Sequence, residues 1–464
     1  MRALALLAVL VLAGCLGGPA PEALQGARVP SLACAVPCVR ALDASESRPW
    51  EPSVAIDPTD PLHLLAGTTV WERDPVTGAR GWLEAHASWD GGLTWERARL
   101  AEAPGPGLDE ALLPANSMGD AVVAFLPDGT ALFAGLGYLH VGASSRDVAP
   151  TFARWAYSLF VARSSDGGRT WPESTEIAQG QGLLAYAGLP APLPTLALPA
   201  AWDAQDKPWL AVGADGTVLA AWSELIGLHP ENPAGYRQDI VAASSADGGR
   251  TWTTPALVER GGQWLGAAPV IAESGWYIAY VDLVSWDLRV ATSRDAGATW
   301  SSASVDRAMP FPSMAVQAVT GGERLWLAYP DGREAKACDF YWECVRQPPL
   351  LRWSDDGGAT WSAPLALDAA DAPGRTVPAV AVAGDGRLIA AFLHPVEEGA
   401  RAEVRAVQVR DGIASAPATI GATDAAPANS GDYMGLAAGP AGAFAVWVAS
   451  PDGSAFDLLG AALR

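Results

Sequence analysis

One eight-residue pattern, Ser-x-Asp-x-Gly-x-Thr-Trp, constrains this chain more than any other feature because it occurs five times. The five copies span residues 88–95, 164–171, 245–252, 293–300 and 354–361. Its Asp can accept hydrogen bonds from backbone N–H groups in a tight turn, and its Gly permits positive φ. Its Thr begins a new strand, and its Trp buries a large apolar face. The pattern therefore predicts a repeated hairpin turn, in which the Asp residues hold the turn and do not act in catalysis.

Around these copies runs a second repeat, in which two short apolar strands flank a tight turn. Its seven units span residues 53–66, 121–135, 209–222, 268–280, 313–329, 377–392 and 433–447. Strands at this spacing are typical of a β-propeller. Seven units favour seven blades, with six blades as the alternative. The last unit continues into a third strand near residues 456–463, and we expect its fourth strand to come from the segment before Glu51.

The repeated motif is the Asp box, and the chain resembles the sialidase-like, BNR-repeat β-propellers. The resemblance covers residues 46–464, which we interpret as a single all-β domain of four-stranded antiparallel blades. It implies a glycoside hydrolase of the exo-sialidase type that acts on extracellular glycans or glycoproteins. Well-known sialidases have six blades, so a count of seven departs from them.

The first residues resemble an export signal. Met1 and Arg2 precede an apolar run that ends in Leu-Ala-Gly-Cys at Cys15, which resembles a lipobox. This predicts a signal peptide over residues 1–14, lipid on Cys15, and a flexible tether over residues 15–45. The protein would then be exported and anchored at the cell surface or the outer face of the membrane. The alternative is an ordinary signal with an incidental cysteine.

Four further cysteines, Cys34, Cys38, Cys338 and Cys344, form two close pairs in the sequence. Outside the cytoplasm, the simplest of three connectivities is a disulfide within each pair. A metal site is the alternative, although neither pair has zinc-ligand spacing with other Cys or His residues.

The charge balance limits the kind of partner. The chain has 51 acidic and 30 basic residues and a net charge of −21. Binding to nucleic acid needs a basic face, so this balance argues against it. It also gives no overall attraction for an anionic substrate. We expect a monomer that contacts a glycan and, through its lipid, the membrane.

The blade geometry predicts a working face. The first-to-second and third-to-fourth turns of a blade share one face, so short Asp-Gly turns and Asp boxes lie together there. Longer segments fall on the opposite face, where function is expected. These segments span residues 71–84, 101–118, 138–157, 177–207, 224–239, 329–349 and 393–401.

The resemblance implies particular site chemistry. In sialidases three arginines bind the substrate carboxylate, a Tyr paired with a Glu is the nucleophile, and an Asp is the acid/base. Tyr433 is the candidate nucleophile, and Glu224 is a candidate catalytic residue. The candidate substrate-binding residues are Arg73, Arg154, Arg237, Arg333 and, for sugar stacking, Trp71. The family's Arg-Ile-Pro signature is absent, and solvated loop charge is the alternative for each charged residue.

Asp120, Asp206 and Asp432 each lie just before or at the start of a predicted innermost strand. Such positions would converge at the mouth of the central channel. The three carboxyls could be acid/base groups with raised pKa values, could bind Ca²⁺, or could cap backbone N–H groups. We expect no other cofactor.

Two functions therefore remain open on the sequence, and whether the protein is an enzyme is undecided. The first is a sialidase-like glycoside hydrolase. The second is a non-catalytic propeller that binds glycan or protein and lacks the sialidase arginine triad, since fold alone does not fix function.

Overall fold

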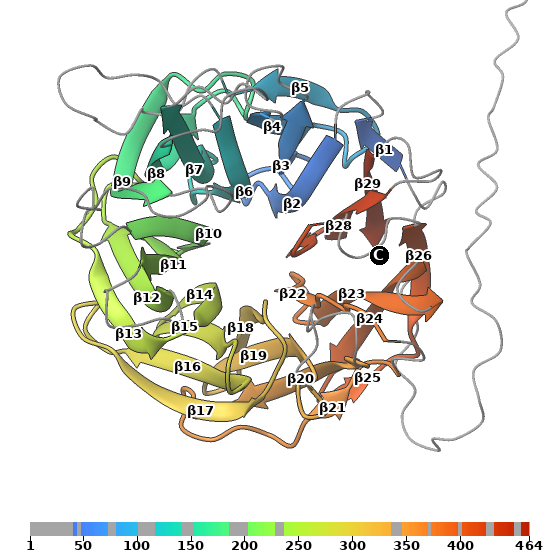
Figure 1. Cartoon of the computed structure of the whole chain (residues 1–464). Coiled ribbons are helices and arrows are strands. Elements are labelled where there is room, and N and C mark those ends of the chain that lie inside the picture. The colour runs from blue at the N-terminus through green and yellow to red at the C-terminus, as the bar shows by residue number, and fades with distance from the viewer. Residues whose placement is uncertain are drawn as a thin grey trace, which may run out of the picture.

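The computed structural model arranges the repeated hairpins as seven antiparallel β-sheets around a central channel (Figure 1). It describes residues 40–43, 48–72, 80–100, 117–141, 153–184, 203–227, 236–335, 346–369, 373–397, 401–423, 431–449 and 456–463. Within these ranges every regular element is a strand. No helix there is long and apolar enough to cross a membrane. The prediction of seven four-stranded blades is confirmed.

The strands of each blade follow the chain from the channel outward. Blade 1 contains β2 (Arg48–Ile56), β3 (Leu64–Glu72), β4 (Arg80–Ser88) and β5 (Glu96–Arg99). Blade 2 contains β6 (Ser117–Phe125), β7 (Ala131–Val141), β8 (Ala153–Ser164) and β9 (Glu173–Leu184). Blade 3 contains β10 (Asp203–Val212), β11 (Val218–Gly227), β12 (Tyr236–Ser245) and β13 (Ala256–Gly262). Blade 4 contains β14 (Trp264–Ala272), β15 (Gly275–Asp282), β16 (Asp287–Ser293) and β17 (Ser301–Arg307).

The later blades follow the same order with two variations. Blade 5 contains β18 (Ser313–Val319), β19 (Gly322–Pro330), β20 (Pro349–Ser354) and β21 (Leu365–Ala366). Blade 6 contains β22 (Ala379–Val382), β23 (Leu388–Glu397) and β24 (Arg401–Arg410), and its outer position is shared by β25 (Ile413–Ala414) and β26 (Ala418–Thr423). Blade 7 contains β27 (Gly435–Gly439), β28 (Gly442–Ala449) and β29 (Asp457–Leu463).

The N-terminal strand β1 (Arg40–Asp43) completes blade 7 and closes the ring. It pairs antiparallel with β29, so the outermost strand of the last blade comes from the segment before blade 1. Leu42 of this strand packs in a core cluster with Val54 of blade 1 and Phe444 of blade 7. The predicted source of the missing strand is therefore confirmed.

Each Asp box is a hydrogen-bonded turn, as predicted. In the second box, Gly168 N and Thr170 N donate to Ser164 Oγ and Asp166 Oδ1 at 2.8 and 2.9 Å. The hydroxyl of Thr170 donates to Asp166 Oδ2 at 2.7 Å, and the other four boxes repeat these contacts. In the fifth box, hydrogen bonds from Thr360 lower the pKa of Asp356 to about 2. These carboxylates hold turns.

The Asp boxes and the first-to-second turns share one face of the ring. Gly91 N, in the first box, donates to Leu62 O in the β2–β3 turn at 2.9 Å. The ring of His63, in the same turn, stacks on Trp89 at 5.0 Å and lies 3.0 Å from Gly167 O of the next box. This face is therefore tied together by its turns, which leaves the starts of the innermost strands on the opposite face.

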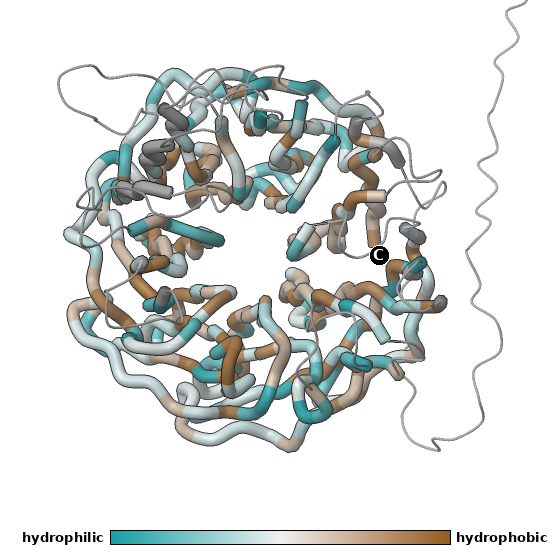
Figure 2. The backbone as a smooth tube through the Cα atoms, viewed as in Figure 1, coloured by the Kyte–Doolittle hydropathy of each residue, from teal (hydrophilic) through white to brown (hydrophobic). Residues whose placement is uncertain are grey.

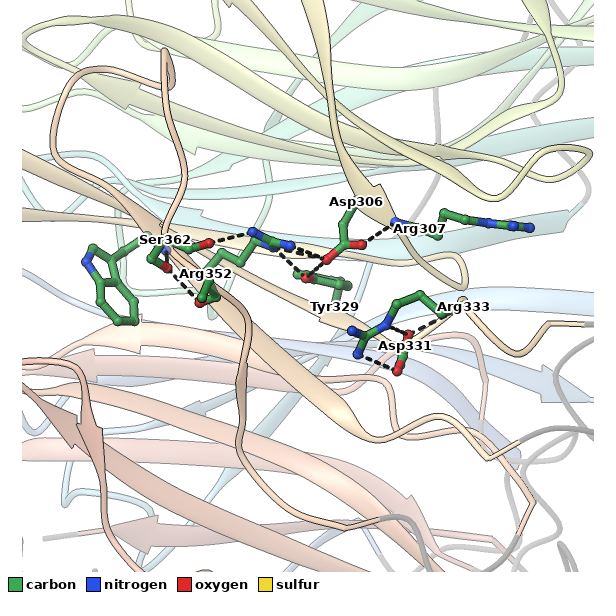
Figure 3. A network of polar contacts seen from close by, with 9 residues as sticks. Asp306, Arg307, Tyr329, Asp331, Arg333, Arg352 and Ser362 are labelled. Atoms are coloured by element: carbon green, nitrogen blue, oxygen red, sulfur yellow. Dashed lines mark hydrogen bonds and ion pairs between the residues drawn. The ribbon is translucent and has the colours of Figure 1, made fainter.

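Acidic side chains on outer strands join neighbouring blades. Asp306 of β17 accepts hydrogen bonds from Tyr329 and Arg352 of blade 5, at 2.6 Å each, as Figure 3 shows. Glu259 pairs in the same way with Tyr280 and Arg289 of blade 4, and Asp368 with His394 and Arg405 of blade 6. Figure 2 shows that hydrophobic positions otherwise concentrate in the middle of the blades and hydrophilic ones along the outer rim.

The structure corrects some loop assignments on the working face. Trp71, Glu224 and Arg237 were expected in loops, but they lie in β3, β11 and β12. The β11–β12 ladder continues past Glu224 to the pair Gly227 and Tyr236. Longer pairing satisfies backbone N–H and C=O groups that a loop would leave to water, so the second and third strands extend beyond the predicted ends.

Candidate active site

The innermost strands share a local irregularity that shapes the mouth of the channel. In blades 1–4 a β-bulge interrupts pairing between the first two strands. In six blades one residue has positive φ, which non-glycine residues rarely adopt. It lies two positions before the point where uninterrupted pairing between the first and second strands begins. These rim positions are Glu51, Asp120, Lys207, Gly266, Phe311 and Val377, and Tyr433 is the corresponding residue of blade 7. The rim is therefore charged over blades 1–3 and mainly apolar over blades 4–6.

Lys207 joins the charged rim positions across the channel. Its ammonium donates to the carboxyl of Glu51 on β2 and, at 3.1 Å, to Asp120 Oδ1 on β6. It also lies 3.1 Å from Asp432 Oδ2, which precedes β27. Burying a charge is costly unless it is paired, and one lysine here pairs with three carboxyls from three blades.

Arg375, which precedes β22, supports the cluster from the side of blade 6. Its guanidinium donates to Asp432 Oδ1 at 2.8 Å and to the backbone oxygen of Gly431 at 3.1 Å. The side chain of Arg375 is 6% exposed, whereas that of Asp432 is 27% exposed. The carboxylate of Asp432 is therefore partly exposed to solvent, and its ion pairs with Lys207 and Arg375 fix its orientation.

Two carboxyls of the cluster have raised pKa values. Burial raises the pKa of Glu51 well above its ordinary value despite the opposing charge of Lys207. Burial also raises the pKa of Asp206 to about 7, and the negative charges of Asp120 and Asp432 add to this effect. Asp206 can therefore donate a proton at neutral pH.

The other two carboxyls stay ionised. Burial disfavours the charged forms of Asp120 and Asp432, but the ammonium of Lys207 holds the pKa of each below its ordinary value. Arg375 adds to this effect on Asp432. Carboxyls whose environments separate their pKa values divide into acids and bases, which is the arrangement that acid/base chemistry needs.

Two tyrosines flank the carboxyls. The hydroxyl of Tyr138 donates to Asp120 Oδ2 at 3.4 Å. The ring of Tyr433 packs edge-on against Trp209 at 5.0 Å, and its hydroxyl is buried without a hydrogen-bond partner in the described part of the chain. Burial and the nearby negative charge of Glu51 raise the pKa of Tyr433 well above 10. Such a phenol stays neutral and can donate a hydrogen bond.

Four predicted site residues, Asp120, Asp206, Asp432 and Tyr433, thus come together at the rim. Glu224 lies elsewhere in blade 3, where burial and the charges of Asp203 and Asp239 raise its pKa.

The remaining predicted residues are dispersed or lie beyond what the structure describes. Arg237 pairs with Asp239 at 3.2 Å, and Arg333 pairs with Asp331 at 2.7 Å. Trp71 is partly exposed on β3. Arg73 lies outside the described residues, as do Cys15, both predicted disulfides and the side chain of Arg154.

Three residues of the cluster, Glu51, Lys207 and Arg375, were not predicted from the sequence. A signal was present for the first two, because Pro52 and Pro208 each follow a rim position, as Pro312 and Pro378 do in later blades. In these four blades the X-Pro step follows the rim residue that has positive φ. Among the described residues, no group of three or more His, Cys, Asp and Glu side chains is arranged to hold a metal ion.

These features define an Asp-box β-propeller with a buried, charge-paired site at one mouth of its channel. The model of the BNR repeat-like domain matches residues 146–390, more than half of the chain, and the protein belongs to this family. No curated protein matches the chain.

Several solved structures are similar to this one. A protein of unknown function from Dyadobacter fermentans DSM 18053 is 14% identical, over 92% of this chain and 99% of that one, with a TM-score of 0.47. A Penicillium chrysogenum α-L-arabinanase is 17% identical, over 74% and 88%, with a TM-score of 0.44. Trypanosoma rangeli sialidase is 14% identical, over 76% and 53%, with a TM-score of 0.43.

Proposed function

We propose that this protein is a glycoside hydrolase and that its reaction takes place at the rim cluster. The observation that carries the proposal is the separation of carboxyl pKa values within one ion-paired cluster at the mouth of the channel. Glycoside hydrolysis needs one carboxyl that donates a proton to the leaving oxygen and one carboxylate that acts as base or nucleophile.

The roles follow from exposure and charge. Asp206 is the general acid, because its pKa is about 7 and its side chain is not fully buried. Asp432 is the carboxylate, because it is ionised and partly exposed. Glu51 and Asp120 are buried and hold Lys207 in place. Tyr433 then binds substrate as a hydrogen-bond donor, since its raised pKa opposes the ionisation that a nucleophile needs.

The substrate is a glycan outside the cytoplasm, which the protein reaches as an exported lipoprotein anchored at Cys15. The arrangement of cations does not favour a sialoside. Arg375 is engaged by Asp432, and Arg237 and Arg333 pair with other carboxylates. A sialic acid carboxylate would need three unpaired arginines, and these three are already paired with carboxylates of the protein.

The test is hydrolysis of fluorogenic glycosides by the purified protein, with a panel of neutral, uronic and sialic sugars. We expect turnover of a neutral sugar, with kcat/KM falling as pH rises through about 7 because Asp206 loses its proton. Asp206→Asn and Asp432→Asn should each lower kcat by roughly 10²-fold or more. Asp385→Asn, in a turn on the Asp-box face, is the matched control and should leave turnover unchanged.

The rival function is a non-catalytic binding propeller, and one observation favours it. Lys207 already pairs with three carboxyls, so the cluster could serve only to join blades 1, 2, 3 and 7. Turnover of a sialoside that Tyr433→Phe abolishes would instead identify a sialidase and its nucleophile. Absence of turnover on the whole panel would reject the hydrolase and leave the binding propeller.

A further inference from the structure

The channel below the rim is a cavity of about 440 Å³ lined mainly by apolar side chains. It extends along the innermost strands of blades 3–7, and β10 alone lines it from Lys207 to Val212, a rise of roughly 16 Å. Its polar lining side chains are Lys207, Ser313 and Tyr433, and Ser313 already accepts a hydrogen bond from Val380 N. Small-molecule sites are commonly lined by apolar side chains with a few polar groups, and the volume falls within the usual range of ligand pockets.

The hydroxyl of Tyr433 gives the cavity one unsatisfied donor. It is buried, it has no hydrogen-bond partner among the described residues, and its ring lines the cavity beside Trp209. A buried polar group without a partner is costly, and native structures rarely retain one without a reason. An oxygen of a bound molecule at the top of the channel would satisfy it.

The charges of the described rim residues disfavour an anionic ligand. Among the residues that the structure describes, Lys207 and Arg375 are the cations beside the opening, and the carboxyls of Glu51, Asp120 and Asp432 already engage them. An added anion would meet the exposed edge of Asp432, and neither of these two cations is available to pair with it. We therefore expect an uncharged group at the rim above the cavity.

We propose that the channel binds the apolar aglycone of a neutral glycoside, with an alkyl or aryl group in the cavity and an ether oxygen accepting a hydrogen bond from Tyr433. This inference rests on the proposed function, because the sugar then lies at the rim beside Asp206 and Asp432. It narrows the substrate class from glycans in general to neutral glycosides with a hydrophobic aglycone.

The first test measures binding by isothermal titration calorimetry with three probes below their micelle-forming concentrations. The probes are n-octyl β-D-glucopyranoside, methyl β-D-glucopyranoside and octanoate. We expect the octyl glucoside to bind roughly tenfold or more tightly than the methyl glucoside, because the two share one sugar and differ in apolar chain. Octanoate should bind more weakly than the octyl glucoside. Equal binding of the two glucosides, or tighter binding of octanoate, would overturn the proposal.

The second test fills the channel without touching the carboxyls. Ala379→Leu places a larger side chain in the lining and should weaken octyl glucoside binding at least tenfold, whereas Ala381→Leu, on the same strand but outside the lining, should not. Tyr433→Phe should weaken binding of both glucosides. If Ala379→Leu fails to fold, Ala268→Leu fills the channel from β14, and the probes on the unaltered protein still decide.

The failure of this inference and of the proposed function can be told apart. Glycoside turnover with equal affinity for octyl and methyl glucosides would overturn the aglycone site and leave the hydrolase standing. A preference for the octyl glucoside that Ala379→Leu removes, without turnover of any glycoside, would support the channel site and reject the hydrolase.

Discussion

At the scale of residues, one lysine governs how the rim carboxyls divide their protons. Lys207 contacts Glu51, Asp120 and Asp432, and its own pKa is raised well above the ordinary value because these carboxylates outweigh the effect of burial. Asp206 lies next to it in the chain, and burial dominates the pKa of Asp206 although the charge of Lys207 opposes this effect. The pKa values of the carboxyls in one cluster are therefore shifted in opposite directions.

The raised pKa of Asp206 predicts that folding stability falls as pH rises. Between pH 4 and 7 the folded protein keeps a proton on Asp206 that the unfolded chain has released, so stability falls as pH rises through this range. Asp206→Asn removes this loss. The measurement is urea denaturation of the variant and the unaltered protein at pH 4.5 and at pH 7.5. From the lower to the higher pH, the difference in free energy of unfolding should shift in favour of the variant by on the order of 3 kcal/mol.

Asp432→Asn is the matched contrast for that experiment. Because Lys207 and Arg375 hold the pKa of Asp432 below its ordinary value, this group is ionised in both folded and unfolded states from pH 4.5 to 7.5. The substitution should therefore destabilise at both pH values, and less at pH 7.5, because the charge of Asp432 also contributes to the raised pKa of Asp206. An identical pH response in the Asp206→Asn variant and the unaltered protein would show that Asp206 is charged in the fold.

At the scale of elements, the Asp-box turns could be predicted from the sequence, whereas contacts between distant blades could not. The hydrogen bonds of an Asp box join residues at most four apart, so the pattern itself contains them. The contact of Lys207 with Glu51 joins residues 156 apart, and only closure of seven blades brings the two together. Asp120, Asp206 and Asp432 could be proposed because each lies near the start of an innermost strand, whereas Lys207 is marked only by the X-Pro step that it shares with other rim positions.

The links between blades offer a second prediction. Arg352 is 16% exposed; it donates to Asp306 across the interface of blades 4 and 5, and to Tyr329 within blade 5. Arg333 is 47% exposed and pairs with Asp331 (Figure 3). Arg352→Met leaves a buried carboxylate without its cation and should lower the free energy of unfolding by about 2–3 kcal/mol. Arg333→Met should change it by less than about 1 kcal/mol. Chemical denaturation of both variants compares them, and equal losses would contradict an inter-blade role for Arg352.

At the scale of the whole molecule, the ring is held by a seam between its first and last blades. Blade 7 takes its outermost strand from β1, and the core at the seam combines Leu42, Val54, Leu64, Phe444 and Leu458. The rim cluster depends on this closure, because Asp432 precedes blade 7 whereas Glu51 belongs to blade 1. Weakening the closure of the ring between blades 7 and 1 should therefore both destabilise the fold and disturb the proposed site.

Leu42→Asp tests this link, because it introduces a charge at a buried position of β1. We expect a loss of about 3 kcal/mol or more in the free energy of unfolding, since both apolar burial and β1 pairing are weakened. Ile413→Asp, at a position that is 45% exposed, is the control and should change little. Hydrogen exchange should show the largest loss of protection in β28, β29 and β2. It should show the smallest loss in blade 4 across the ring, because outside the rim cluster each blade packs against its two neighbours (Figure 1). Glycoside turnover should fall with it, since opening the seam separates Asp432 from Lys207. Uniform loss of protection in all blades would show instead that the ring opens as one cooperative unit.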